Sequence, residues 1–301
     1  MSKERLKIWI LSGIQGSGKS TEAKKIFKEN KNTYRVNRDA LRQCLYMDDF
    51  SPRHEHVVTE MSDMMVKALL NYKCNVIVDN MNLTEKDTNW YKELAKHYEA
   101  DIQFIKMDTP IEECIRRDAE RGKAGQRAVG KNVILNTAWR HGIHRSTNKC
   151  VVVDMDGTLA DCMHRVHYVR NLNDDPNFKK NWFMFNKEMA NDTLRLDVLN
   201  KVLEVIKSQG EPVDFIICSA REDTFRKETE EWLDRHFIPY DRLIMRRGGD
   251  SRDDAIIKRE LLDNMLDKGK IVKVFDDRPK VIRMWRENGL DVEDVGGGVE
   301  F

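Results

Sequence analysis

Short apolar runs alternate with longer amphipathic segments along the whole chain. The apolar runs are rich in Ile, Val and Leu, which is typical of strands that are buried on both faces of a sheet. The longer segments carry apolar residues at helical spacing, as Val57, Met61, Met64 and Met65 do within residues 54–72. This alternation predicts an α/β protein in which helices cover both faces of parallel sheets.

The same pattern gives approximate boundaries for the predicted elements. The predicted strands are residues 6–12, 34–37, 75–79, 102–107, 150–154, 213–219 and 271–276. The predicted helices are residues 20–29, 38–46, 54–72, 84–97, 194–209, 224–236, 253–267 and 279–288, and one more that begins at Pro110. Residues 161–191 fit neither pattern, so they form either a small cap over a site in the second half or a mobile loop.

A polar stretch near the middle of the chain marks a predicted domain boundary. The 301 residues exceed what one ordinary hydrophobic core supports. Residues 145–149 read Arg-Ser-Thr-Asn-Lys, directly before an apolar run. We therefore predict a first domain over residues 1–147 and a second over residues 148–301, each with its own parallel sheet.

The net charge of +1 conceals a difference between the two halves. Residues 1–150 hold 27 Lys and Arg against 20 Asp and Glu, and residues 151–301 hold 25 against 31. A basic half suits a polyanion such as ATP or nucleic acid, although ordinary scatter also gives such differences. The chain shows no apolar run near the roughly 18 residues of a membrane span. It also lacks a leader pattern and a paired-cysteine motif, so we expect a cytoplasmic protein with reduced thiols and no membrane partner.

A phosphate-binding loop is predicted at residues 13–20, which read Gly-Ile-Gln-Gly-Ser-Gly-Lys-Ser. The spacing G-x-x-x-x-G-K-[ST] is complete, with a predicted strand before it and a predicted helix after it. Backbone N–H groups of such a loop surround phosphate oxygens, the Lys reaches the outer phosphates, and the Ser holds Mg²⁺. The residues expected to bind the nucleotide, ATP, are Gly13, Gly16, Ser17, Gly18, Lys19 and Ser20.

Charged residues follow the next strands at the same expected edge of the sheet. Asp39 is placed to accept the proton of an attacking hydroxyl, and Arg42, one turn later, to hold a phosphate of the acceptor. Arg38 and Asp79 are expected to contact the acceptor or water bound to a metal. Arg121, before a Gly-rich loop, is placed to neutralise the transferring phosphoryl group. The alternatives are that Asp39 only caps a helix, that Asp79 is a turn residue at the end of a strand, and that the arginines are solvated.

The strongest signal in the second half is residues 154–158, which read Asp-Met-Asp-Gly-Thr after an apolar strand. One carboxylate, Asp154, can attack phosphorus and form an aspartyl-phosphate. A second, Asp156, can protonate the leaving group and then activate water. Mg²⁺ is expected because an anion must attack an anion. A Ca²⁺ loop is excluded because its third ligand and its final Glu are missing.

Further polar residues follow later strands in the second half. Ser219 offers a hydroxyl to a phosphate oxygen, and Arg221 and Lys258 offer positive charge to the same group. Asp276 and Asp277 are paired carboxylates at the end of a strand. The predicted Mg²⁺ ligands of the two sites are Ser20, Asp154, Asp156, Asp276 and Asp277.

These motifs carry a family resemblance. The acidic motif 154–158, Ser219, Lys258 and the pair 276–277 resemble, in order, the four motifs of haloacid dehalogenase-type phosphatases. The first half resembles P-loop 5′-polynucleotide kinases, and the combination resembles the T-even phage type of polynucleotide kinase/3′-phosphatase. The resemblance implies a P-loop kinase sheet followed by a haloacid dehalogenase-like Rossmannoid sheet.

The resemblance also implies a function. The chain would transfer the γ-phosphate of ATP to a 5′-hydroxyl of DNA or RNA and remove 3′-phosphates, so that a ligase can act. It further implies a homotetramer in the cytoplasm of a phage host. The choice between RNA and DNA, the preferred end, and the opening of a 2′,3′-cyclic phosphate stay open at this point.

Two other hypotheses compete with this one. The first is a kinase of nucleosides or sugars fused to a small-molecule phosphatase. The second is a nucleotide-dependent binding module whose catalytic residues have lost their role. The intact carboxylates Asp39, Asp154 and Asp156 argue against the second hypothesis.

Overall fold

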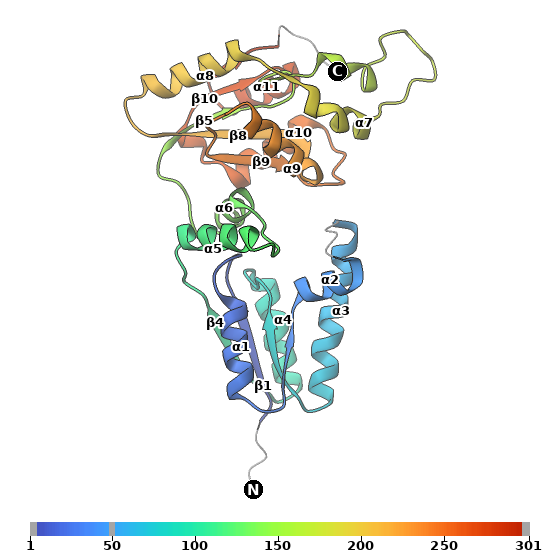
Figure 1. The fold of residues 1–301 in the computed structure, drawn as a ribbon, viewed down its shortest axis with the longest axis vertical. Helices are drawn as coiled ribbons and strands as arrows, with labels where there is room; N and C mark the ends of the chain where they lie inside the picture. The colour runs from blue at the N-terminus through green and yellow to red at the C-terminus, as the bar shows by residue number, and fades with distance from the viewer. Residues whose placement is uncertain (1–4, 48–51, 297–301) are drawn as a thin grey trace. The chain divides into compact units, whose positions relative to one another are not determined.

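The computed structural model describes residues 5–47 and 52–296. It divides into two compact units, Met1–Arg145 and Ser146–Phe301. Each unit is described here by itself, and Figure 1 gives the labels of the helices and strands.

The first unit is built on a parallel sheet with the strand order β2-β3-β1-β4. The strands are β1 (Lys7–Ser12), β2 (Thr33–Val36), β3 (Asn75–Asp79) and β4 (Asp101–Lys106). The helices are α1 (Lys19–Glu29), α2 (Arg38–Tyr46), α3 (Pro52–Asn71), α4 (Glu85–His97), α5 (Ile111–Lys123) and α6 (Lys131–Arg140). Because all four strands are parallel, their carboxyl ends lie at one edge of the sheet, and the loops that follow them meet there.

Side chains of β1 alternate between the two faces of this sheet, as the strand period requires. Ile8 and Ile10 pack in one cluster of buried residues, whereas Trp9 and Leu11 pack in another beneath α1. Burial of each such side chain contributes roughly 1.5–3 kcal/mol. The central strand is therefore held from both sides, and the loop that follows it has a fixed base.

The second unit is built on a parallel sheet with the strand order β11-β10-β5-β8-β9. Its strands are β5 (Lys149–Val153), β8 (Val213–Glu222), β9 (Arg242–Arg246), β10 (Ile271–Asp276) and β11 (Val292–Asp294). Its main helices are α8 (Leu196–Ser208), α9 (Arg226–Arg235), α10 (Asp254–Met265) and α11 (Pro279–Glu287). The two sheets together confirm the predicted α/β fold.

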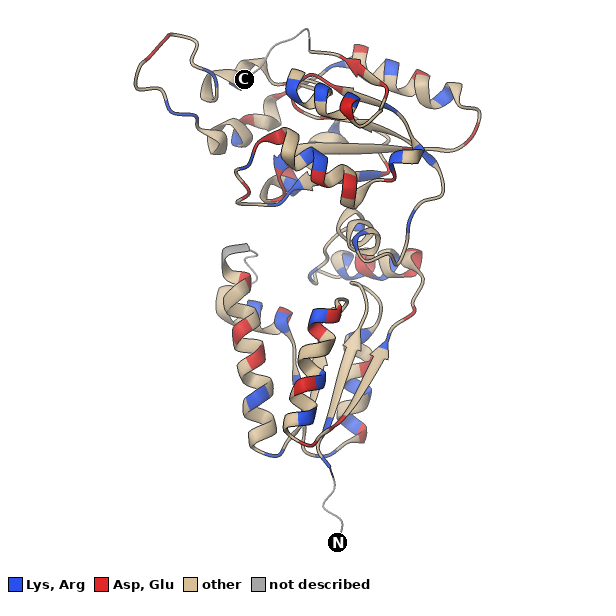
Figure 2. Cartoon of the chain, turned by 180° about the vertical axis from the view of Figure 1, so that it is seen from behind, with Lys and Arg blue, Asp and Glu red and all other residues tan. Residues whose placement is uncertain are grey.

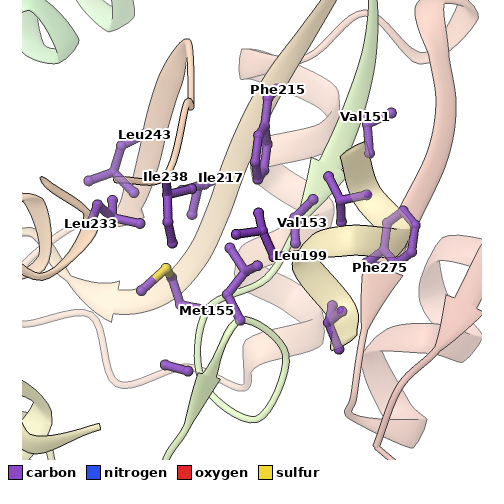
Figure 3. Packing of buried hydrophobic residues seen from close by; sticks show 14 of the residues in the cluster. Val151, Val153, Met155, Leu199, Phe215, Ile217, Leu233, Ile238, Leu243 and Phe275 are labelled. Carbon is purple, nitrogen blue, oxygen red and sulfur yellow. The ribbon is translucent and has the colours of Figure 1, made fainter. Parts of the chain in front are cut away.

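A single large cluster of buried apolar residues covers one face of the second sheet. It includes Val151, Val153, Phe215, Ile217 and Phe275 from the three central strands (Figure 3). Helices α8 and α9 supply the opposing side chains. The ends of β5, β8 and β10, which carry the polar motifs, are thereby fixed relative to one another.

Residues 161–191 form a small folded cap, which decides between the two alternatives that the sequence left open. The cap elements are β6 (Ala160–Asp161), η1 (Met163–Tyr168), α7 (Trp182–Lys187), η2 (Glu188–Asn191) and β7 (Thr193–Leu194). Cys162, Val166, Val169 and Phe185 form its own buried cluster. A long loop of this segment extends away from the sheet in Figure 1.

Among the described residues, the elements outside the cap that the sequence pattern missed include α6, β9 and β11. Strand β9 begins and ends with Arg, and β11 has three residues, so neither gives an apolar run of the usual length. Acidic and basic residues are interspersed on the helices of both units in Figure 2. Within residues 5–47 and 52–296, no helix is both long enough and apolar enough to cross a membrane.

Candidate active sites

The phosphate loop of the first unit connects β1 to α1, and its glycines have a structural reason. Gly16 and Gly18 have φ angles of 77° and 93°, a backbone conformation that residues with a side chain rarely adopt. A Cβ at Gly16 would lie 2.3 Å from the backbone oxygen of Cys114. Any larger residue would therefore push the loop away from α5 and change the cradle formed by the backbone N–H groups.

Lys19 lies over this loop. Its Nζ donates to the carbonyl oxygens of Gly13 and Ile14, at 2.9 and 2.8 Å. Burial lowers the pKa of Lys19, and the carboxylates of Asp79 and Asp39 act in the opposite direction. The ammonium group is thus held at the mouth of the loop, where a phosphate would replace carbonyl contacts with stronger charge-assisted ones.

The hydroxyl of Ser20 and the carboxylate of Asp79 meet at the carboxyl end of β3. Ser20 Oγ donates to Asp79 Oδ2 at 2.9 Å, and Arg35 Nε donates to the same oxygen at 2.8 Å. Asp79 Oδ1 is buried and has no hydrogen-bond partner among the described residues. A hydroxyl beside an unsatisfied carboxylate oxygen is a donor set that suits Mg²⁺. Asp79 thus lies beside Ser20, the residue expected to hold Mg²⁺.

Asp39 sits between two arginines at the start of α2. Its side chain is 69% exposed, Arg42 bonds to its Oδ1, and Arg127 from the loop after α5 reaches the same oxygen at 3.0 Å. Arg42 also donates to both carboxylate oxygens of Glu55, at 2.7 and 2.9 Å. We expected Arg42 to hold a phosphate, but in this structure it links Asp39 to Glu55.

Arg38 and Arg121 each lie beside a carboxylate of the first unit. The Arg38 guanidinium lies 4.0 Å from Asp63 on α3. Arg121 donates to Asp118 Oδ1 at 2.6 Å. Asp118 is buried and also accepts backbone N–H groups of residues 129–130, so it fixes the end of the Gly-rich loop and the position of Arg121 together.

In the second unit, Asp154 follows β5 and Asp276 ends the neighbouring strand β10. Lys258 Nζ lies 2.9 Å from Asp154 Oδ2 and 2.8 Å from Asp276 Oδ2, and Trp285 Nε1 donates to Asp276 Oδ2 at 3.1 Å. Lys258 is almost fully buried, and these carboxylates raise its pKa despite the opposing effect of burial. Lys258 therefore stays charged between two strand ends.

Three carboxylates in this unit form a compact acidic cluster. One oxygen each of Asp154, Asp276 and Asp277 lies within 4.8 Å of the others. Burial, together with Asp276 and Asp277, raises the pKa of Asp154 to about 8 against the pull of Lys258, and burial together with Asp276 raises the pKa of Asp277 to about 7. Negative charge is thus in excess here. An all-oxygen set of this kind fits Mg²⁺.

Asp156 stands apart from the acidic cluster, although we expected it among the metal ligands. Its carboxylate bonds to two buried guanidiniums. Arg221 donates from Nε to Oδ2 at 2.9 Å and from Nη2 to Oδ1 at 2.6 Å, and Arg165 donates to Oδ1. Burial opposes ionisation of Asp156, but Arg221 and Arg165 outweigh it and hold its pKa below the usual range. Asp192 pairs with both arginines at the back, at 2.5 and 3.1 Å.

Ser219 lies on β8, next to β5. It is buried, and its Oγ accepts the backbone N–H of Arg221 at 3.1 Å. Its hydroxyl hydrogen is thereby left to donate to a phosphate oxygen. We expected Arg221 to bind phosphate as well, whereas in this structure its guanidinium is bonded to Asp156 and Asp192.

Sequence reasoning missed several charged residues that these sites use, namely Arg35, Glu55, Arg127, Arg165 and Asp192. None belongs to a motif of fixed spacing. Arg165 lies in the segment without a clear pattern, and only the structure shows that it contacts Asp156. In the sequence, the one available signal for Arg165 was its position nine residues after Asp156.

Replacing Gly157 by Ala is expected to lower the phosphatase rate at least tenfold. Gly157 has φ 80°, and a Cβ there would lie 2.1 Å from Asp277 Oδ2, so the acidic cluster must shift. Gly210→Ala is a matched control, because Gly210 has φ 66° but no atom within 4 Å of the added Cβ. Rates and melting temperatures of both variants test the prediction. Equal effects in the two variants would mean that only backbone strain matters.

Comparison with known proteins gives two family models that match separate parts of the chain. A family model described as the polynucleotide kinase PNKP phosphatase domain matches residues 148–299, and a model described as an AAA domain matches residues 8–141. A chain of the Pnkp1/Rnl/Hen1 RNA repair complex is 29% identical, with a TM-score of 0.43, and the alignment covers 99% of this chain and 98% of that one.

Two known proteins from a virus and an archaeon also match this chain, one over most of its length and one over less than half. A bifunctional polynucleotide kinase/RNA ligase of Autographa californica nuclear polyhedrosis virus is 26% identical over 306 residues, which is 92% of this chain. The chain spans 40% of the length of that viral relative. An L-seryl-tRNA(Sec) kinase of Methanococcus maripaludis is 25% identical over 41% of this chain and 49% of that protein.

The family model covers half of the chain and includes the whole acidic site. The phosphate loop lies inside the AAA match. The two family models and the viral relative fit a kinase-type domain followed by a phosphatase-type domain and do not single out the T-even phage type. The chain belongs to the family of the polynucleotide kinase PNKP phosphatase domain, here preceded by a P-loop kinase-type domain.

Proposed function

We propose that this chain repairs nucleic-acid ends by two reactions. It transfers the γ-phosphate of ATP to a 5′-hydroxyl, and it hydrolyses a 3′-phosphate. The observation that carries the proposal is the presence of two separate phosphate-handling sites, in a chain whose second half belongs to a polynucleotide phosphatase family. The products, a 5′-phosphate and a 3′-hydroxyl, are the ends that a ligase joins.

The kinase reaction would use the loop of the first unit. The loop and Lys19 would bind the phosphates of ATP, and Ser20 with Asp79 would hold Mg²⁺, which neutralises charge on the phosphates. Asp39 would accept the proton of the 5′-hydroxyl as its oxygen bonds to the γ-phosphorus and the bond to ADP breaks. Arg127 and Arg42 both bond to Oδ1 of Asp39 in this structure, so Oδ2 is the oxygen that would accept the proton.

The phosphatase reaction would use the strand ends of the second unit. Asp154 would attack the 3′-phosphate, the P–O3′ bond would break, and water would then hydrolyse the aspartyl-phosphate. Mg²⁺ held by Asp154, Asp276 and Asp277 would offset the repulsion between the anions. Asp156 would give its proton to the 3′-oxygen and take one from the water. Its low pKa in this structure requires the negatively charged phosphate to approach before Asp156 can carry a proton.

The main alternative is a kinase and phosphatase of small molecules. Purified protein, Mg²⁺ and labelled ATP would be offered a 5′-hydroxyl oligonucleotide and, separately, a nucleoside, while release of phosphate is followed from a 3′-phosphorylated oligonucleotide. We expect label on the oligonucleotide and loss of its 3′-phosphate. Label on the nucleoside alone would refute the proposal.

Partners and assembly follow from the same proposal. A functional link to a ligase fits the products, and the viral relative named above carries the name of a kinase/RNA ligase. From the resemblance to the T-even phage type, we also propose that the protein is cytoplasmic and assembles as a homotetramer. Sedimentation of the purified chain tests this extension, and a monomer at micromolar concentration would contradict it. RNA and DNA oligonucleotides offered in competition show which polymer is preferred.

A further inference from the structure

The short helix α7 of the cap has an inner and an outer side. On the inner side, the ring of Phe185 lies 4.0 Å from the guanidinium carbon of Arg165, which bonds to Asp156. One turn earlier, Trp182 contacts the edge of Phe185, with ring centroids 5.6 Å apart. Two side chains, Phe185 and Arg165, thus lie between Trp182 and the Asp156 carboxylate proposed as general acid.

On the outer side, Phe183 is 64% exposed. Trp182, although it contacts Phe185 on the inner side, is also 41% exposed. Phe183 lies 6.0 Å from Phe225, just beyond the carboxyl end of β8. The rings are therefore at the edge of the sheet where the phosphatase residues gather. Two neighbouring aromatic rings that keep much of their surface exposed beside a site are available for contact with a ligand.

Two positively charged side chains lie over the Trp182 ring. Lys180 Nζ lies 5.5 Å from its centroid, and the guanidinium carbon of Arg278 lies 5.9 Å away. Arg278 directly follows Asp277 of the acidic cluster and pairs with Asp254. An aromatic ring with cations over it matches a nucleobase and the adjoining phosphates, because the base can take the place of a cation on the ring while the displaced Lys or Arg pairs with a phosphate.

We propose that Trp182 and Phe183 are a stacking platform for the terminal bases of a single-stranded 3′ end. The 3′-phosphate would reach Asp154 while the terminal base stacks on Trp182 and the next base contacts Phe183. Lys180 faces the sugar–phosphate chain. This inference rests on the proposed 3′-phosphatase function and adds to it how the substrate is recognised. Because every base has a π face, such a platform binds ends of any sequence.

The test compares two substrates and two enzymes. One 3′-phosphorylated oligonucleotide carries a normal terminal base and the other an abasic terminal nucleotide. We expect kcat/KM of the unmodified protein to be about tenfold higher for the normal end, in the range that base stacking gives. Trp182→Ala should process both substrates at the same low rate, because the partner of the base is gone. Retention of the full preference for the normal end by Trp182→Ala would overturn the platform.

Controls separate stacking from loss of the fold. Phe237→Ala removes a more exposed aromatic ring in the connection from α9 to β9, at the opposite edge of the sheet, and should keep the tenfold preference. The melting temperature of Trp182→Ala shows whether the cap stays folded. If the melting temperature falls, Phe183→Ala decides: a reduced preference for the normal end supports the platform, and an unchanged one overturns it.

The two proposals fail in distinguishable ways. If the unmodified protein removes phosphate from neither oligonucleotide, the proposed phosphatase function fails. If it hydrolyses both at equal rates, the phosphatase function stands and the platform alone is wrong.

Discussion

Lys19→Ala is expected to lower the kinase rate by roughly 10²–10³-fold while the phosphatase rate stays unchanged. Lys19 is the ammonium group that the loop holds over the carbonyls of Gly13 and Ile14. Negative charge on the transferring group and on ADP must be balanced in the transition state, and an aligned cation does this at no cost of reorganisation. The residues that perform the second reaction lie in the other unit, so they keep their contacts.

The measurement is label transfer from ATP to a 5′-hydroxyl oligonucleotide and release of 3′-phosphate, in one protein preparation. Lys24→Ala is the matched control, because Lys24 lies on the same helix and is exposed. It should leave both rates within about twofold, since isolated surface charges contribute little. Loss of phosphatase activity in a folded Lys19→Ala variant would contradict two independent sites.

The sequence predicted those parts of the sites that depend on local spacing. The phosphate loop occupies eight consecutive residues, and the acidic motif occupies five, so strand, turn and side chains are all encoded together. The end of β10 was equally visible because Asp276 and Asp277 interrupt an apolar run. At such positions the parallel sheet does the rest, because it brings successive strand ends to one edge.

Contacts between distant segments were not predictable in the same way. Arg127 reaches Asp39 across 88 positions, and Arg221 reaches Asp156 across 65. A single Arg has no spacing that identifies it, and its long side chain reaches several partners. Arg42 and Arg221 are examples. Both were singled out in the sequence as phosphate-binding residues, but in this structure their guanidinium groups bond to carboxylates of the protein.

The cap illustrates a second limit of the sequence pattern. Its helix α7 has six residues, and its cluster is built around Cys162, Val166, Val169 and Phe185, too few to give a clear period. Yet these contacts place Arg165 against Asp156 and leave Trp182 facing outward. Small irregular elements are where substrate contacts arise, because the strands of the sheet are committed to the core.

Asp154→Asn is expected to abolish the phosphatase reaction, with a loss of four orders of magnitude or more, and to leave the kinase rate intact. A neutral amide lacks the nucleophilic oxygen that attacks phosphorus. The amide has the same size, and Lys258 keeps its 2.8 Å contact with Asp276, so the fold should persist. The variant should also bind Mg²⁺ more weakly, because one of three clustered carboxylates is lost.

Rapid-quench measurement of phosphate release, together with calorimetry of Mg²⁺ binding, tests this prediction. Asp197→Asn is the matched control: Asp197 is 66% exposed on α8, outside the acidic cluster, and should leave both quantities unchanged. If Asp154→Asn keeps a tenth of the activity, a different group must attack phosphorus. If instead the variant unfolds, the Lys258–Asp154 pair stabilises the fold as well as the site, and Asp154→Glu, which keeps the charge but moves the nucleophile, separates the two roles. Folded Asp154→Glu with a rate as low as that of Asp154→Asn would show that the position of this carboxylate, and not its charge alone, drives the reaction.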